Sequence, residues 1–252
     1  MDWSPQEMMI IAAAREIADG DVVFVGMRLP IVAYGVARLT HAPNAVGLFE
    51  CGIVRTEPAA TTLYTMGDPA NQQGAAWCTS TCNLLGMMQA GRVDVGFIGG
   101  AEIDCFGNIN SSYVGDFRAP TVKLPGSGGA ADIAATSRRL VAIMNHEKRR
   151  LVPRVDYVTS PGWLAGGASR RAAGLARGGP AAVITDLAVL RPDDAGDELC
   201  LASWHPGATP DAVSERTGWT LRRLPDARET PPPTAAELDA LRGIDKEGFW
   251  RR

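Results

Sequence analysis

The sequence has no excess of positive charge and no long apolar run, and these two absences exclude whole classes of function. Its 252 residues include 25 Lys and Arg against 28 Asp and Glu, a formal net charge of -3. Such a chain is not built to neutralise nucleic-acid phosphates or to adhere to an anionic membrane. No stretch approaches the roughly 20 apolar residues of a membrane-spanning helix, and the N-terminus carries acidic Asp2 without the basic start of a secretion signal. We expect no nucleic-acid partner, no membrane association and a cytoplasmic location.

Residues that bind metals are also scarce. The histidines are His41, His146 and His205, and the five cysteines are an odd number, which disfavours a disulfide framework where no secretion signal is expected. Cys78 and Cys82 are close in sequence, but a structural zinc site needs two further ligands at comparable spacing. We expect reduced thiols, partly buried side chains at Cys78 and Cys82, no metal and no permanently bound cofactor.

The composition that remains is that of an ordinary globular protein. With 46% hydrophobic and 21% charged residues, the chain is long enough to bury a full core. We expect one domain over residues 1–252, with a C-terminal extension from about residue 225. Glycine- and proline-rich segments at 165–180 and 225–233 predict surface segments, and residues 234–242 predict a short amphipathic helix packed on the domain or on a partner.

Alternating helix and strand signals predict the fold class. Ser4, Pro5 and Glu7 have the form of a helix start with a capping box, and we expect this helix to run to about Asp19. A strand, a helix and a strand form a βαβ unit over residues 21–25, 30–39 and 46–50. The alternation continues less regularly with a helix at 82–90 and strands at 93–98, 140–144 and 181–185. We therefore expect an open, mostly parallel α/β sheet with helices on both faces.

Glu50 is the most informative position, because it lies between an apolar run and a glycine in the segment VGLFECG at 46–52. Open α/β sheets bind ligands beyond the carboxyl ends of their strands, and Glu50 is expected at such an end. Taken alone, a glutamate there is most often a solvated loop residue or a cap. Two glycine segments, Gly99-Gly100 and 126–129, are expected at or near the same edge.

Neither glycine segment is a Walker A loop or a G-x-G-x-x-G fingerprint, so nucleotide binding of those types is not indicated. In the second segment, the amides of Gly128 and Gly129 have no adjacent Cβ and can face an oxygen directly. The same residues are typical of a tight turn before a helix starting near Ala131, and the two interpretations are compatible.

Taken in order, six motifs resemble the beta subunit of class I coenzyme A transferases, most closely the glutaconate type. The motifs are VGLFECG at 46–52, IGGAEID at 98–104, FGNIN at 106–110, PGSGGA at 125–130, HEKRR at 146–150 and DYVTSPGW at 156–163. The resemblance covers the chain from about Val22 to Asp186. It implies the CoA-transferase fold, a coenzyme A thioester and a carboxylic acid as substrates, and a separate alpha subunit as partner in a hetero-oligomer.

The resemblance also assigns chemistry to Glu50. In this family the glutamate of an E-S-G or E-N-G motif attacks the acyl-CoA thioester, and a glutamyl-CoA thioester later passes CoA to a second acid. Glu50 stands at that position, and the glycine-rich loop points to Gly128 or Gly129 as the oxyanion-hole amide. Contacts with substrate or CoA are expected from Cys51, Gly99, Gly100, Asn108, Ser127, Ala130 and Arg28. The basic segment 146–150 with Arg154 is more typical of a solvated face than of a phosphate site, and His146 of a structural histidine.

Two residues depart from the family's pattern. Serine is usual where this chain has Cys51, and glycine where it has Arg28. Cys51 is either a packing substitute or a second reactive group, and Arg28 either meets a substrate carboxylate or reshapes the pocket. The glutaconate likeness suggests a short dicarboxylic acyl group. The alternatives are an acyl-CoA decarboxylase or ring-opening hydrolase, activities that accompany loss of the glutamate in relatives, and a non-catalytic partner subunit.

Overall fold

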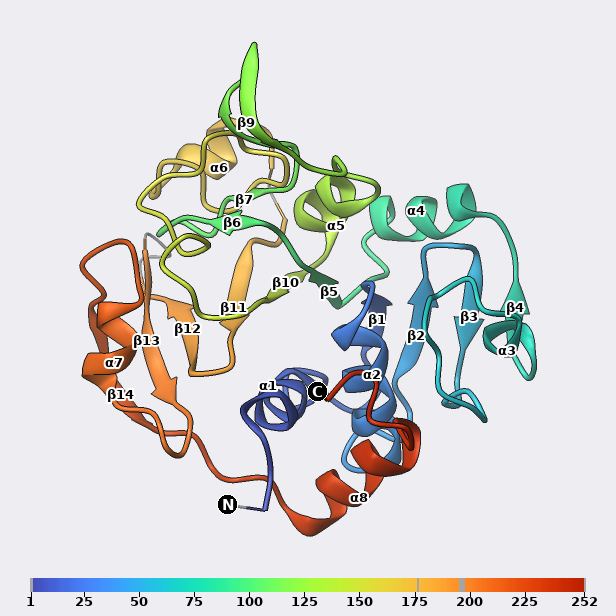
Figure 1. Cartoon of the computed structure of the whole chain (residues 1–252). Helices are drawn as coiled ribbons and strands as arrows, with labels where there is room; N and C mark the ends of the chain where they lie inside the picture. The colour runs from blue at the N-terminus through green and yellow to red at the C-terminus, as the bar shows by residue number, and fades with distance from the viewer. Residues whose placement is uncertain (1, 176, 195–197, 252) are drawn as a thin grey trace.

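A ten-stranded sheet runs through the computed structural model, which describes residues 2–175, 177–194 and 198–251 (Figure 1). The strand order is β14-β13-β12-β11-β10-β5-β1-β2-β3-β4. The strands are β1 (Val22–Val25), β2 (Val46–Phe49), β3 (Ile53–Arg55), β4 (Trp77–Cys78), β5 (Val95–Ile98), β10 (Arg139–Ile143), β11 (Pro180–Ile184), β12 (Ala188–Pro192), β13 (Leu199–Trp204) and β14 (Arg223–Glu229). The central strands β2, β1, β5, β10 and β11 are parallel to one another. Antiparallel pairs join β3 and β12 to this centre, and the predicted mostly parallel α/β sheet is confirmed.

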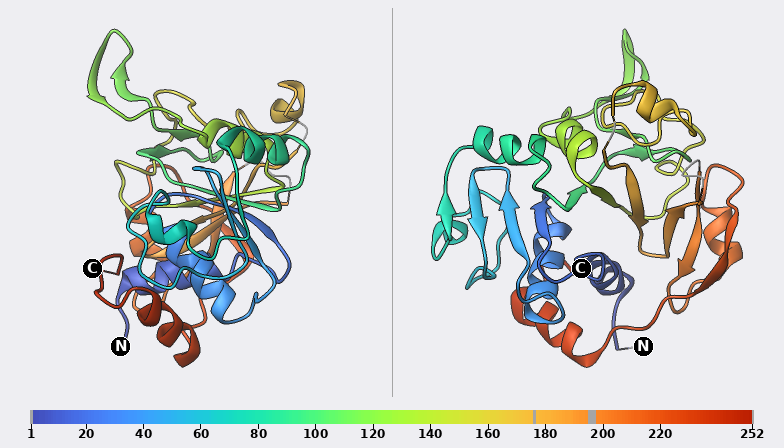
Figure 2. Two further views of the ribbon diagram at one scale, coloured as in Figure 1. Left: turned by 90° about the vertical axis from the view of Figure 1, so that its right-hand side faces the viewer. Right: turned by 180° about the vertical axis from the view of Figure 1, so that it is seen from behind.

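Helices cover both faces of the sheet, as predicted, and Figure 2 shows the two layers. One face carries α1 (Pro5–Ala14), α2 (Leu29–Leu39) and α8 (Ala235–Ile244), which contact one another. The other carries α4 (Thr81–Gln89) and α5 (Ala130–Thr136). The shorter helices are α3 (Pro69–Gln72), α6 (Ser169–Ala172) and α7 (Pro210–Glu215). Two buried hydrophobic clusters, one under each layer, form the core.

The N-terminal βαβ unit follows its local sequence signals. Ser4 and Glu7 form the predicted capping box, with Ser4 Oγ accepting from the Glu7 amide at 3.1 Å and the Glu7 carboxylate accepting from the Ser4 amide at 2.9 Å. Helix α1 ends at Ala14 rather than Asp19, because the Asp21 carboxylate accepts from the Ala18 amide and turns the chain into β1. Strands β1 and β2 then pair in parallel on either side of the α2 crossover.

The C-terminal residues fold back onto α1 and α2. Thr234 caps α8 in a capping box with Glu237, whose carboxylate also binds Arg15 of the segment after α1 at 2.7 Å. The predicted surface segment 225–233 is largely exposed, but its first part belongs to β14, an edge strand that pairs with β13. The predicted surface segment 165–180 contains Arg170, which is 2% exposed. Its guanidinium is buried because it donates to four backbone carbonyls, including that of Ala134.

Two small hairpins stand outside the main sheet. They consist of β6 (Glu102–Ile103) with β7 (Ile109–Asn110) and of β8 (Tyr113–Asp116) with β9 (Ala119–Lys123). The β8–β9 hairpin projects from the molecule in all views (Figures 1 and 2). Within the described ranges, no helix has the length and apolar character needed to cross a membrane.

Candidate active site

Glu50 lies at the carboxyl end of β2, in the tight turn that leads into β3. The Gly52 amide donates to the Phe49 carbonyl at 2.9 Å, and Gly52 has φ +95°. This is a three-residue hairpin loop closed by a glycine in the left-handed region. A Cβ on Gly52 would lie 2.1 Å from the Thr79 carbonyl oxygen. Thr81 Oγ1 donates to the Glu50 carbonyl at 2.7 Å, so the backbone of the glutamate is fixed on both sides.

The Glu50 side chain reaches the glycine-rich loop. Its Oε1 accepts a hydrogen bond from the Gly129 amide at 3.0 Å. A Cβ on Gly129 would lie 3.0 Å from that oxygen and 3.2 Å from Glu50 Cδ, whereas a Cβ on Gly128 would lie 3.7 Å away. Of the two glycines that the sequence left open, Gly129 therefore presents its amide to the carboxylate. Its missing side chain permits the approach.

The same loop is also the predicted turn before a helix. The Gly126 amide donates to the Ser111 carbonyl, and Ser111 Oγ donates to the Gly126 carbonyl, both at 2.8 Å. The Ala130 amide donates to the Ser127 carbonyl at 2.9 Å and closes a turn around the two central glycines. Ser127 is exposed and Ala130 starts α5. Turn and amide presentation thus occur together, as the sequence predicted.

Cys51 follows the glutamate but does not have the properties of a nucleophile. Its Sγ donates to the Met66 carbonyl at 3.1 Å. Partial burial of the sulfur raises the pKa of Cys51, and the neighbouring Glu50 charge acts in the same direction. Because the thiolate is the reactive form, a raised pKa makes this thiol less reactive near neutral pH. The geometry favours the packing interpretation of Cys51.

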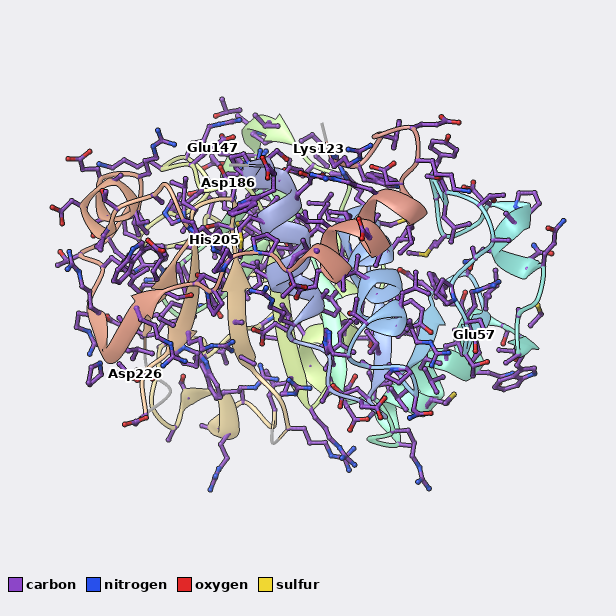
Figure 3. All side chains as sticks on the ribbon, turned by 90° about the horizontal axis from the view of Figure 1, so that it is seen from below. Glu57, Lys123, Glu147, Asp186, His205 and Asp226 are labelled. Atoms are coloured by element: carbon purple, nitrogen blue, oxygen red, sulfur yellow. The ribbon has the colours of Figure 1, made fainter. Side chains whose placement is uncertain are left out.

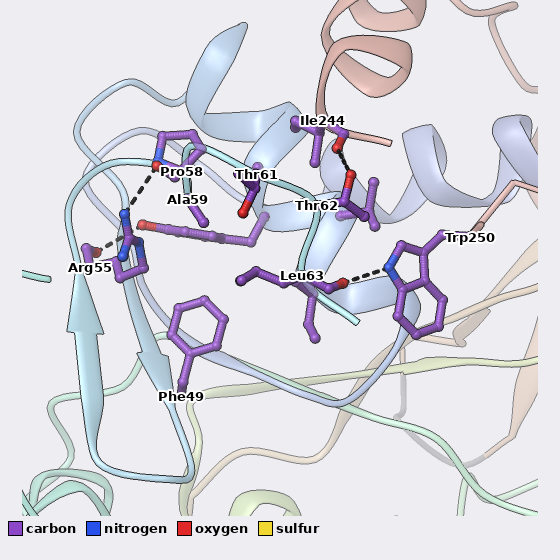
Figure 4. Close-up of a pocket in the computed structure, with 13 residues that line it drawn as sticks. Phe49, Arg55, Pro58, Ala59, Thr61, Thr62, Leu63, Ile244 and Trp250 are labelled. Carbon is purple, nitrogen blue, oxygen red and sulfur yellow. Dashed lines mark hydrogen bonds between the residues drawn. The ribbon is translucent and has the colours of Figure 1, made fainter. Parts of the chain in front are cut away.

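Phe49, the residue before the turn, belongs to a packed cluster that Figure 4 shows in close-up. Thr62 Oγ1 donates to the Ile244 carbonyl at 2.7 Å, and the Trp250 indole donates to the Leu63 carbonyl at 2.8 Å. The residual cavity lined by Phe49 and these residues is about 20 Å³. That volume holds little more than one water molecule, so this cluster offers no room for an acyl group.

Arg28, Gly99 and Gly100 line a larger cavity, of about 490 Å³, at the carboxyl ends of β1, β5 and β10. Glu50 follows the adjacent strand β2, so its carboxylate and this cavity lie at the same edge of the sheet. Arg150, which the sequence placed only in a basic segment, lines the cavity as well. No local sequence pattern predicts that Arg150 lines this cavity, because the segment after β10 reaches the cavity only in the folded chain.

Arg28 has an unusual backbone conformation, with φ +71° and ψ -121° at the start of α2. Residues other than glycine rarely adopt positive φ, and sparsely populated conformations cost about 1–3 kcal/mol each. The family resemblance places a glycine here, which would accept this conformation without strain. Arg28 therefore combines a backbone conformation that costs free energy with a side chain that lines the cavity.

Asn108 lies apart from Glu50 and from this cavity, in the β6–β7 hairpin. It is 2% exposed. Its Nδ2 donates to the Asp104 carboxylate and to the Leu164 carbonyl, and its Oδ1 accepts from the amides of Gly162 and Leu164. These partners use its hydrogen-bonding capacity within the chain. The structure gives Asn108 a role in holding the loop that follows β10, and substrate contact stays a prediction.

Two histidines are buried in hydrogen-bonded positions. His146 lies between Thr185 Oγ1 and Thr217 Oγ1, each at 3.0 Å. His205 contacts Thr230 Oγ1 at 3.1 Å and the Thr185 carbonyl at 2.9 Å. Burial lowers the pKa of each to about 4. His146 thus has the geometry of the predicted structural histidine, and Figure 3 shows His205 in the same region as Asp186, the carboxylate that accepts from the His146 amide.

The cysteines outside the turn do not form a site either. Cys78 and Cys82 are exposed rather than partly buried, because β4 is the last strand of the sheet and Cys82 lies on the outer side of α4. In the part of the chain that the structure describes, no group of three or more His, Cys, Asp or Glu side chains could hold a metal ion.

A sequence profile described as "Coenzyme A transferase" matches residues 6–216. The chain belongs to the coenzyme A transferase family. It is 40% identical over 244 residues to the beta subunit of the 3-oxoadipate CoA-transferase of Pseudomonas knackmussii, covering 96% of this chain and 94% of that one. It is 34% identical over 248 residues to the beta subunit of the glutaconate CoA-transferase of Acidaminococcus fermentans, covering 96% and 92%.

Solved structures confirm the CoA-transferase fold. The glutaconate coenzyme A-transferase from Acidaminococcus fermentans matches with a TM-score of 0.93 at 32% identity, covering 100% of this chain and 98% of that one. The decarboxylase AibA/AibB matches with a TM-score of 0.84 at 31% identity, covering 98% and 97%. The resemblance to the beta subunits of this family, predicted from six short motifs, is confirmed.

Proposed function

We propose that this chain is the beta subunit of a CoA-transferase that moves CoA between an acyl-CoA and a free carboxylic acid through a glutamyl-CoA thioester on Glu50. The contact between Glu50 Oε1 and the Gly129 amide, 3.0 Å long, is the observation that carries this proposal. It joins a carboxylate at a strand end to a backbone donor on a glycine loop, as acyl transfer to and from a carboxylate requires.

The reaction begins when the Glu50 carboxylate attacks the thioester carbonyl. CoA leaves as a thiolate and the acyl group forms a mixed anhydride with Glu50. The thiolate then attacks the glutamyl carbonyl, which releases the first acid as a carboxylate and leaves the glutamyl-CoA thioester. The carboxylate of the second acid attacks this thioester, and the expelled thiolate takes the new acyl group from the second anhydride, which restores Glu50.

The Gly129 amide is placed for the steps at the glutamyl carbonyl. In those steps the negative charge of the tetrahedral intermediate develops on a carboxyl oxygen of Glu50 itself. A useful oxyanion donor lies 2.7–3.1 Å from that oxygen, and the Gly129 nitrogen is 3.0 Å from Oε1. The donor is in place before the reaction begins.

The names of the relatives suggest the partner and the substrate class. Both sequence relatives are beta subunits, one of a 3-oxoadipate and one of a glutaconate CoA-transferase. We propose that this chain is active only with an alpha subunit, that it works in the cytoplasm without a permanently bound cofactor, and that its acyl group is a short dicarboxylate. The remaining site assignments, Cys51, Ser127 and Ala130 beside Glu50, are part of the same proposal.

The test is to trap the intermediate in the complex with the alpha subunit. Incubation with acyl-CoA and then borohydride should reduce the thioester and inactivate the wild type, with the modification mapped to Glu50 by mass spectrometry. Glu50→Gln should show no modification and no exchange. Glu57→Gln is the control, because Glu57 is exposed beyond β3 and pairs with Arg38 at 2.9 Å.

Other outcomes would replace the proposal. Decarboxylation or ring opening without a glutamyl adduct would assign the chain to one of those two activities, which the decarboxylase AibA/AibB and the cholesterol ring-cleaving hydrolase IpdB subunit, at 31% and 26% identity, represent in the family. A co-purifying complex without turnover across acyl-CoA and acid combinations would make this chain a non-catalytic subunit. Full transferase activity from the chain alone would disprove the need for an alpha subunit.

A further inference from the structure

The 490 Å³ cavity at the carboxyl ends of β1, β5 and β10 has the charge of an anion site. Eleven residues line it, and none of these is acidic. Two are arginines, Arg28 on the loop after β1 and Arg150 on the chain that follows β10. Asn145 and Gln6 add neutral polar groups. An anion entering this space meets two guanidinium groups and no lining carboxylate.

Of the two arginines, Arg28 is the one whose side chain has no partner among the described residues. Within the described residues its side chain has no hydrogen bond or ion pair, and it does not cap α2, whose first turn contains no acidic residue. Its exposed guanidinium adjoins a cavity rather than a neighbouring side chain. The positive φ at this position shows that packing of the backbone does not demand an arginine. The Arg28 guanidinium is therefore available to a ligand in the cavity.

Arg150 is held in place by the protein but is not neutralised by it. Its Nη1 donates to the Gly100 carbonyl at 3.4 Å, and its Nε lies 3.6 Å from the Glu147 carboxylate. Glu147 is shared, because it also binds Arg149 at 2.5 Å. One carboxylate between two arginines leaves this group with a net positive charge, and the Gly100 contact keeps Arg150 at the cavity.

The cavity lies at a suitable distance from Glu50 for one end of a short acid to reach it. Strands in a sheet are about 4.8 Å apart, so a site centred above β5 is on the order of 10 Å from the end of β2. The Glu50 side chain and the long arginine side chains each cover part of this distance, so a short dicarboxylic acyl group has to span only the remainder with its far carboxylate. The phosphates of CoA are separated from the thioester by the whole pantetheine arm, which is longer.

We infer that Arg28 and Arg150 form the specificity site for the acyl group, and that they bind the carboxylate of a dicarboxylic substrate that does not react with Glu50. This inference rests on the proposed transferase function and names the residues that select its substrate. The planar guanidinium groups donate in the geometry that a carboxylate accepts. A monocarboxylic acid of the same length would leave both arginines without an anion.

The experiment compares two acceptors of equal chain length, glutarate and pentanoate, with acetyl-CoA as donor, in the complex with the alpha subunit. The wild type should prefer glutarate. In Arg28→Gln the ratio of kcat/KM for glutarate to that for pentanoate should fall by about 10–100-fold, the usual effect of losing a hydrogen-bonded charge. Arg150→Gln should lower the same ratio.

Arg92→Gln is the matched control. It removes the same charge from an exposed arginine that lies before β5, at the opposite edge of the sheet from Gly99. The ratio should not change in this variant. Three results would overturn the inference: a wild type that does not prefer glutarate, a variant whose kcat/KM falls equally for both acceptors, or a variant that changes only the KM for acetyl-CoA. The third result would assign the arginines to the phosphates of CoA.

Failure of this inference differs from failure of the proposed function. If borohydride labels Glu50 in wild type and in Arg28→Gln while the acceptor ratio stays constant, the transferase function stands and only the specificity site is wrong. If no acyl-CoA labels Glu50 in the wild type, the function itself fails.

Discussion

Glu50 and Gly129 are separated by 79 residues in sequence, and the amide of one donates to the carboxylate of the other at 3.0 Å. The glutamate belongs to the β2–β3 turn and the glycine to the loop before α5, so the bond joins two parts of the chain that local folding does not bring together. A bond of this kind orients the carboxylate before substrate arrives. Preorganised donors of this type typically contribute about 10²–10³ in rate.

We predict that alanine mainly lowers turnover at Gly129 and mainly lowers stability at Gly128. Gly129→Ala places a Cβ 3.0 Å from Glu50 Oε1 in a backbone conformation, φ -81°, that alanine accepts. Its turnover should fall by about 10–100-fold, because misplacement by about 1 Å can cost on the order of 10², while its stability is unchanged. Gly128→Ala has room, with 3.7 Å to the same oxygen, but φ is +49°. This variant should lose about 1–2 kcal/mol of its free energy of unfolding. Its turnover should fall less than that of Gly129→Ala.

These two variants are compared by kcat in the assembled enzyme and by thermal unfolding at one protein concentration. A Gly129→Ala enzyme with wild-type turnover would remove the contact with Gly129 from the mechanism.

The turn residues give a second prediction. Glu50→Asp keeps a carboxylate but withdraws it by one methylene, so the activity should fall by about 10²-fold without disappearing. Cys51→Ser should retain near-normal activity, because the Cys51 sulfur donates to the Met66 carbonyl at 3.1 Å and a hydroxyl can do the same. Exchange assays measure both variants. Mapping of a covalent acyl or CoA adduct to Cys51 would contradict the assignment of roles.

Arg28→Gly should raise the stability of the protein and lower its preference for glutarate over pentanoate. Glycine relieves the strained φ of +71°, a gain of about 1–3 kcal/mol, but increases the entropy of the unfolded chain at a cost of about 0.5–1 kcal/mol. A net gain near 1 kcal/mol corresponds to about 2–4 °C in Tm for a chain of this size. Arg28→Gln retains the Cβ and should show no rise, which is the control. Equal Tm values for all three proteins would show that position 28 is not strained.

Because His146 and His205 are buried, we predict that the protein loses stability at pH values above those at which carboxylates titrate. Burial lowers the pKa of His146 and His205 from 6.5 to about 4 in the folded protein. Between these pH values the unfolded chain binds more protons, so stability is full above pH 6.5 and declines as the pH falls towards 4. The slope is up to about 1.4 kcal/mol per pH unit for each histidine.

Urea unfolding of the assembled enzyme at pH 7.0, 6.0 and 5.0 measures this decline. His146→Asn and His205→Asn should each reduce the slope, even where they lower the stability at pH 7.0. Glu7 and Glu237 have lowered pKa values and start to contribute only near and below 4.5. A flat stability between pH 7.0 and 5.0 would contradict the buried neutral state of the two histidines.

Local patterns predicted the position of Glu50 and the shape of the glycine loop, because an apolar run that ends at a strand terminus and a glycine-rich turn are both local features. They could not predict that Gly129 rather than Gly128 faces the carboxylate. That choice depends on how the Glu50 turn and the loop before α5 meet in space, and these two segments are distant in sequence. The same holds for the meeting of Arg28 and Arg150 at one cavity.

Edge strands escaped prediction for a different reason. Strand β14 exposes most of its side chains, and β4 has only two residues, so neither carries a hydrophobic pattern. For Asn108, the family resemblance implies contact with substrate or CoA, and that contact stays a prediction. No local pattern predicts its hydrogen bonds with Asp104, Gly162 and Leu164, because Gly162 and Leu164 are distant in sequence.

The geometry of the Glu50 turn determines which of its residues can be substituted without moving the carboxylate. Gly52 cannot be replaced, because its φ is +95° and the Thr79 carbonyl occupies the place of a side chain. Cys51, between Glu50 and that glycine, is exposed, and the thiol that contacts the Met66 carbonyl is only a weak donor. Substitution at this middle position therefore changes the polarity beside the carboxylate without moving it. The turn therefore accepts a change of side chain at position 51 that it does not accept at position 52.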